Sequence, residues 1–90
     1  MRVFEKNHIS SATTTTVLNS QQGVLRYITV NTTAAGAITV YDGTTSGTVV
    51  AILKSNIAEG TYRFDCVMSK GITVVTAAAS DITVVWEVLN

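Results

Sequence analysis

The chain has 90 residues, of which 47% are hydrophobic and only 13% are charged, and six basic and six acidic residues leave no net charge at pH 7. This length suits one small domain, and the scattered basic residues argue against binding of nucleic acid, since no Lys/Arg cluster could neutralise a run of phosphates. An ordinary soluble domain carries about 25% charged residues, so a surface this poor in charge indicates that another subunit covers part of it.

The N-terminal segment differs from the rest of the chain. Val3 and Phe4 stand among charged and polar residues, and the segment lacks the apolar core and cleavage site of a signal peptide. We predict an N-terminal arm over residues 1–11, with an edge strand as the alternative for the first eight, followed by a single β-sandwich domain over residues 12–90. We expect no association with a membrane. We also expect that the chain is made in a reducing, cytosol-like compartment.

The following segments combine β-branched residues with a period of two, which is typical of strands rather than helices. A run of threonines favours an extended first strand, and the segment after residue 23 carries large apolar groups on both faces, as a central strand would. The predicted strands are Thr13–Leu18, Val24–Asn31, Ala37–Asp42, Val49–Lys54, Thr61–Met68, Ile72–Ala77 and Asp81–Val88.

The tripeptide Ile-Thr-Val occurs four times, beginning at Ile28, Ile38, Ile72 and Ile82. Each copy places two apolar side chains on one face of a strand and a hydroxyl on the other. The copies form two pairs with a ten-residue offset, which predicts a hairpin from each pair. A duplicated hairpin and a shared compositional bias explain these pairs equally well.

A third hairpin is predicted at Asp42-Gly43, because this dipeptide favours the positive φ of a tight turn before the strand restarts at Val49. About eight short strands at a spacing of 8 to 12 residues indicate an all-β, antiparallel β-sandwich, a jelly roll or a small barrel. Val75 and Val85 extend two of the tripeptide copies onto the opposite face, where a lone soluble sandwich would carry polar groups. We therefore expect a partner to cover them.

Residue types that carry chemistry are few. His8 and Cys66 are the single histidine and the single cysteine, and no nucleophile motif accompanies either. The loop from Asp42 to Thr48 lacks both the lysine and the following helix of a phosphate-binding loop, and Asp42 is its one acidic group. The sequence therefore predicts no enzyme, no cofactor and no metal site.

The aromatic residues offer a different kind of site. Tyr27, Tyr41, Tyr62 and Trp86 could form a platform on which a sugar stacks, but no Asn, Asp or Gln group is placed around them. We interpret them mainly as core or interface residues.

Four segments resemble small virion proteins of tailed bacteriophages, in particular the capsid decoration or cement type. They are Gly23-Val-Leu-Arg-Tyr-Ile-Thr-Val-Asn, Ile38-Thr-Val-Tyr-Asp-Gly-Thr-Thr-Ser-Gly-Thr-Val-Val-Ala, Gly71-Ile-Thr-Val-Val-Thr and Asp81-Ile-Thr-Val-Val-Trp-Glu. The resemblance implies a jelly-roll-like fold, a homo-oligomer with a trimer favoured, and a place on the outside of a phage capsid against the major capsid protein, after synthesis in the host cytoplasm.

The arm and the two extra valines supply the candidate partner-contact residues. They are Arg2, Val3, Phe4, Lys6, His8, Val75 and Val85. The alternative function is a tail-fibre or neck-associated β-sandwich module that binds a receptor or a carbohydrate through the loop from Asp42 to Thr48. A third possibility is a small assembly chaperone that is absent from finished particles.

Overall fold

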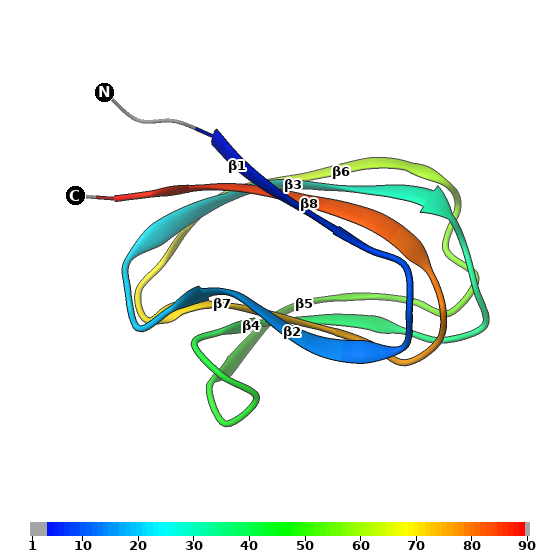
Figure 1. Ribbon diagram of the computed structural model, residues 1–90, viewed down its shortest axis with the longest axis horizontal. Coiled ribbons are helices and arrows are strands. Elements are labelled where there is room, and N and C mark those ends of the chain that lie inside the picture. Colours follow the sequence, from blue (N-terminus) through cyan, green and yellow to red (C-terminus); the bar gives the residue numbers. More distant parts are fainter. Residues whose placement is uncertain (1–3, 90) are drawn as a thin grey trace.

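The computed structural model describes residues 4–89 as two four-stranded antiparallel sheets packed face to face (Figure 1). Sheet A has the strand order β1-β8-β3-β6, and sheet B has the order β2-β7-β4-β5. The predicted all-β sandwich of eight short strands is confirmed. The strands are β1 Phe4–Ile9, β2 Thr13–Asn19, β3 Gly23–Thr32, β4 Ile38–Asp42, β5 Thr48–Leu53, β6 Gly60–Met68, β7 Gly71–Thr76 and β8 Asp81–Val88.

The pairing of the strands is nested. β1 pairs with β8, β2 with β7, β3 with β6 and β4 with β5, and these pairs alternate between the two sheets. The β3–β8 and β4–β7 pairs then join the halves of each sheet. This arrangement, two sheets wound from one long folded-over hairpin, is a jelly roll.

Two of the three predicted hairpins are wrong. β3 and β4 lie in opposite sheets, as do β7 and β8, whereas β4 and β5 form the hairpin expected at Asp42-Gly43. The tripeptide puts its apolar side chains into the core whether the chain returns beside the previous strand or crosses to the facing sheet. Local pattern therefore cannot distinguish a hairpin from a crossing connection.

The four Ile-Thr-Val copies occupy the two central strands of each sheet. In sheet A, Ile28 lies opposite Val84 and Val30 opposite Ile82, and in sheet B Val40 lies opposite Val74. The isoleucines and valines of all four copies are at most 2% exposed. They form the centre of one hydrophobic core between the sheets.

The N-terminal segment is an edge strand rather than an arm. β1 pairs with β8 in continuous register from Phe4 opposite Glu87 to Ile9 opposite Ile82. The predicted arm over residues 1–11 is thus corrected for Phe4–Ile9, because this strand supplies one edge of sheet A and places Ile9 in the core. Arg2 and Val3 lie outside the described residues.

The turn between β6 and β7 depends on glycine. Gly71 has φ +134°, a conformation that side chains disfavour, and a Cβ there would lie 2.5 Å from the carbonyl oxygen of Leu18. This close approach sets β2 against the start of β7.

Candidate interaction surfaces

The outer faces of the two sheets differ in charge. The strands of sheet A carry seven Asp, Glu, Lys or Arg residues, whereas those of sheet B carry one, Asp42, at the end of β4. We call the outer side of sheet A the charged face and that of sheet B the neutral face. The difference is a property of the fold, because strands that are neighbours in a sheet, apart from β4 and β5, are not consecutive in the sequence.

A cluster of paired charges crosses the charged face. Arg26 donates from Nη1 to Asp65 Oδ1 at 3.2 Å and from Nη2 to Glu87 Oε1 at 2.8 Å, and its guanidinium lies 5.2 Å from the ring centre of Phe4. The Glu87 side chain is only 3% exposed, so its contact with Arg26 lies in a weakly screened environment. Arg63 extends the cluster, at 3.7 Å from Asp65.

Irregularities in the strands bring this cluster together. The β3 register shifts between Leu25 and Tyr27, leaving Arg26 as an extra residue against β8. On β6, Asp65 adopts a positive φ of 49° beside the same shift. Such bulges re-aim side chains, here two opposite charges toward each other.

A second polar group lies at the other end of the charged face. His8 Nε2 and Asp81 Oδ1 are 2.6 Å apart, and Asn31 donates to the same oxygen at 3.1 Å. The hydrogen bond with His8, followed by that with Asn31, holds the pKa of Asp81 below its ordinary value of 3.8. This pair ties β1 to β8 at the side-chain level.

The neutral face consists of two rows of side chains that run across all four strands of sheet B. Directly paired residues share a face of a sheet, so the register defines each row. The first row is Thr14, Val75, Thr39 and Ile52, and the second is Thr16, Thr73, Tyr41 and Val49. Neither row contains a charged group.

The exposed large apolar side chains of sheet B lie on its edge strand β5. Ile52, Val49 and Val50 are 63%, 46% and 38% exposed, and they are three of the five exposed large hydrophobic residues among the described ones. An edge strand that presents apolar side chains without charge is a site of association or aggregation.

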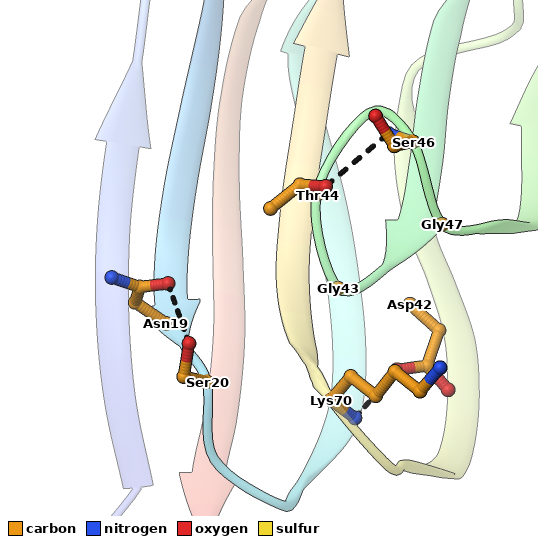
Figure 2. Close-up of a pocket in the computed structure, with 8 residues that line it drawn as sticks. All are labelled: Asn19, Ser20, Asp42, Gly43, Thr44, Ser46, Gly47 and Lys70. Carbon is orange, nitrogen blue, oxygen red and sulfur yellow. Dashed lines mark hydrogen bonds between the residues drawn. The ribbon is translucent and has the colours of Figure 1, made fainter.

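A polar hollow of about 260 Å³ lies at one end of the sandwich (Figure 2). It is bounded by the turns after β2, β4 and β6, and its lining residues are Asn19, Ser20, Asp42, Gly43, Thr44, Ser46, Gly47 and Lys70. The Asp42 carboxylate is already engaged there, accepting from the backbone N–H groups of Ser69 at 3.0 Å and Lys70 at 2.8 Å. Its role is to hold the β6–β7 turn against β4.

The loop beyond Asp42 projects from the outer side of sheet B (Figure 1). The buried Thr73 hydroxyl donates to the Gly43 carbonyl at 2.6 Å, and the Gly43 N–H donates to the Gly71 carbonyl at 3.0 Å. The hairpin loop predicted by sequence is therefore a loop fastened at its base to β7.

The four aromatic residues do not form a platform. Tyr27 lies on the charged face under the Arg63 guanidinium, 5.6 Å from the ring centre, whereas Tyr41 lies on the neutral face. Tyr62 and Trp86 turn inward and pack on the core. The sugar-stacking arrangement is thus absent from residues 4–89.

The structure divides the predicted contact residues between the two faces. Phe4, Lys6, His8 and Val85 come together on the charged face, whereas Val75 lies on the neutral face. Val85 is only 7% exposed because its own chain covers it, with Lys6 on one side and Tyr27 on the other. The expectation that a partner must cover Val85 is therefore corrected.

Sequence reasoning missed the exposed residues of β5. In the sequence, Val49 and Ile52 have the pattern of ordinary hairpin residues. The alternation of side chains along a strand does not distinguish an edge strand from a central one. The available signal was the absence of any charge between Gly43 and Leu53.

Comparisons with known proteins establish the fold and no family. No family model and no curated protein matches the chain. Among solved structures, the chain is similar to the Drosophila NLP core, described in terms of pentamer formation and histone binding, with a TM-score of 0.62, 12% identity, and coverage of 100% of this chain and 98% of that one. This likeness confirms a nucleoplasmin-like jelly roll.

A second similar structure comes from Bacillus endospore appendages, described as disulfide-linked pili, with a TM-score of 0.46, 20% identity, and coverage of 99% of this chain and 89% of that one.

Two negative observations concern residues 4–89. No group of three or more His, Cys, Asp or Glu residues there is placed to hold a metal ion. No helix in the same range is long and apolar enough to cross a bilayer.

Proposed function

We propose that the chain is a structural subunit that assembles with copies of itself and docks on a protein shell, as a decoration or cement protein on the outside of a phage capsid. The observation that carries this proposal is the neutral face, which spans four strands without a charged side chain and ends in the apolar edge strand β5. Burying such a surface gains about 25 cal/mol per Å² of apolar area without desolvating a charge.

The two faces suit two different contacts. The neutral face favours permanent contact between copies, because obligate interfaces resemble a protein core. The charged face, where Phe4, Lys6 and His8 gather, suits the major capsid protein as partner, since its polar and aromatic groups resemble the rim and anchors of a docking interface.

The oligomeric state we propose is a homo-oligomer, with a trimer expected from the resemblance to decoration proteins. The Drosophila NLP core, which has the same fold, is described as a pentamer, and this supports association through a jelly roll. A basic partner such as a histone does not fit this chain, because six acidic and six basic residues leave no net charge to attract it.

The test is to add the purified protein to capsids that lack it, assembled from the major capsid protein of the same phage. We expect co-sedimentation with the capsids up to a fixed stoichiometry and a higher capsid melting temperature by calorimetry. The double variant Phe4→Ser, Lys6→Glu should lose capsid binding while it keeps its oligomeric state. A protein that is monomeric and leaves capsid heat resistance unchanged would contradict the proposal.

The second candidate is a tail-fibre or neck-associated module that binds a receptor or a carbohydrate, and the polar hollow beside Asp42 is the observation that favours it. A glycan array separates the two functions. Specific binding that is lost in Lys70→Ala would support the module, whereas an absence of binding at millimolar ligand argues against it. Protein analysis of purified virions distinguishes both from an assembly chaperone.

A further inference from the structure

We infer that copies of the chain join head to tail through sheet B, with β5 of one copy beside β2 of the next, in a closed ring. The inference rests on the proposed function, because it presupposes a homo-oligomer.

The four edges of the sandwich are protected unequally. In sheet A, edge strand β1 carries Glu5 and Lys6, and edge strand β6 carries Arg63 and Asp65. Charged side chains on an edge prevent another strand from adding to it. The edges of sheet A are therefore protected against pairing with a strand of another copy.

The edges of sheet B carry no such charges. β2 is Thr-Thr-Thr-Thr-Val-Leu-Asn, β5 is Thr-Val-Val-Ala-Ile-Leu, and each pairs on one side only, with β7 and with β4. Each strand contains a bulge, at Val17 and at Val50, which interrupts regular backbone pairing along the edge. Apolar side chains that become buried in the contact must therefore contribute as much as backbone hydrogen bonds. Ile52 and Val49 supply that apolar surface.

A second copy is the occupant that covers both edges. Two copies related by a two-fold axis could pair β5 with β5, but every β2 would stay open. In a head-to-tail contact, β5 of each copy meets β2 of the next, and a closed ring leaves neither edge of sheet B exposed.

The strand directions fit this arrangement. Successive strands across sheet B are antiparallel, so β2 and β5, at its two ends, run in opposite directions. A rotation about an axis along the strands preserves their directions, and β5 therefore meets the neighbour's β2 in antiparallel orientation. The neutral face of each copy is then continuous with the neutral face of the next.

The area of two such contacts can be compared with the accessible surface of one chain. A standard contact buries about 800 Å² on each partner. Two such contacts per copy would cover about a third of the 4796 Å² accessible surface. Coverage to this extent is consistent with the low charge content of the chain.

The first experiment compares Ile52→Lys with Val67→Lys by sedimentation velocity on the full chain. Ile52 on β5 and Val67 on β6 are 63% and 62% exposed, so the two variants introduce the same charge at equally exposed apolar sites on different sheets. We expect Ile52→Lys to sediment as a monomer at concentrations where wild type is fully associated. Val67→Lys should keep the wild-type oligomer, and circular dichroism should show that both variants are folded.

The second experiment tests the head-to-tail geometry with Thr14→Lys on β2. This variant should also be monomeric, and mixing it with Ile52→Lys should give a dimer with one copy of each by native mass spectrometry. The mixture recovers one intact contact, between the unmodified β5 of the Thr14→Lys chain and the unmodified β2 of the Ile52→Lys chain.

The outcomes separate this inference from the proposed function. If wild type associates but either lysine variant on sheet B keeps the wild-type oligomer, the ring through β2 and β5 is wrong while the assembly function stands. A monomeric Ile52→Lys with an unaffected Thr14→Lys would indicate a two-fold β5–β5 contact instead. A wild type that is monomeric at all concentrations overturns both.

Discussion

Thr73 shows how a single hydroxyl fastens a loop to a sheet. It is 1% exposed on the neutral face, donates to the Gly43 carbonyl at 2.6 Å and lies 3.1 Å from the Thr16 hydroxyl. A buried polar group is tolerated when it is hydrogen-bonded, and here the bond also fixes the base of the loop after β4.

The variant Thr73→Val should therefore lower the free energy of unfolding by about 1–2 kcal/mol, because the Gly43 carbonyl loses its hydroxyl donor. Urea unfolding of monomeric protein at low concentration measures the change. Thr39→Val is the matched control, since Thr39 is on the same face, is partly buried and makes no side-chain hydrogen bond within the described residues. Equal stability of the two variants would rule out this role for Thr73.

The lowered pKa of Asp81 predicts that the folded protein loses stability in acid. Its folded-state pKa is lowered, chiefly by the hydrogen bond with His8, so the unfolded state binds more protons in acid. The resulting stabilisation is complete above the unfolded-state pKa of about 4 and is lost as pH falls through the folded-state pKa. Unfolding by urea between pH 2 and 6 should show a smaller loss of stability toward acid in Asp81→Asn than in wild type. His8→Gln should reduce the slope similarly, and an unchanged slope in both variants would contradict the assignment.

At the scale of elements, β1 is the strand for which the structure differs most from the prediction made from the sequence. Its side chains are mostly exposed and polar, which is why the segment resembles a flexible arm, yet its backbone extends sheet A along β8. Backbone pairing depends on the partner strand and leaves little trace in the strand's own sequence.

Removal of residues 1–8 should thus lower the thermal midpoint and shift Trp86 fluorescence to the red, because the deletion opens the edge of β8. Trp86 is 8% exposed and lies opposite Glu5 of β1. Phe4→Ala, which leaves the strand in place, is the control and should keep the blue emission. A truncated chain with wild-type midpoint and emission would restore the arm interpretation.

At the scale of the whole molecule, charge is sorted between two faces. Sheet A collects charges from the first and the last strand, whereas sheet B collects the segments rich in threonine and valine. The sorting gives the sandwich one side suited to water or polar contacts and another suited to association.

Association through sheet B should link thermal stability to protein concentration. Because only the folded state assembles, the midpoint of wild type should rise as concentration is increased from about 1 to 100 μM. Ile52→Lys should have a midpoint that is independent of concentration. Parallel behaviour of wild type and variant in differential scanning fluorimetry would contradict a β5 contact.

The sequence by itself determined the fold class, the positions of seven strands, the hairpin at Asp42-Gly43 and the core role of the Ile-Thr-Val copies. These features follow from side-chain branching, alternation with a period of two and turn chemistry, which act between near neighbours. The low content of charged residues, which is a property of the whole composition, also led to the prediction that another subunit covers part of the surface.

Only the tertiary structure decided which strands share a sheet, and hence that copies one and four meet in sheet A while copies two and three meet in sheet B. It also decided that Val85 is covered by its own chain, and that Ile52 lies on an unprotected edge. Both tripeptide pairs satisfy the core equally well by hairpin or by crossing, so the choice rests on the packing of the whole chain. Edge and face are relations between distant segments, and local pattern does not contain them.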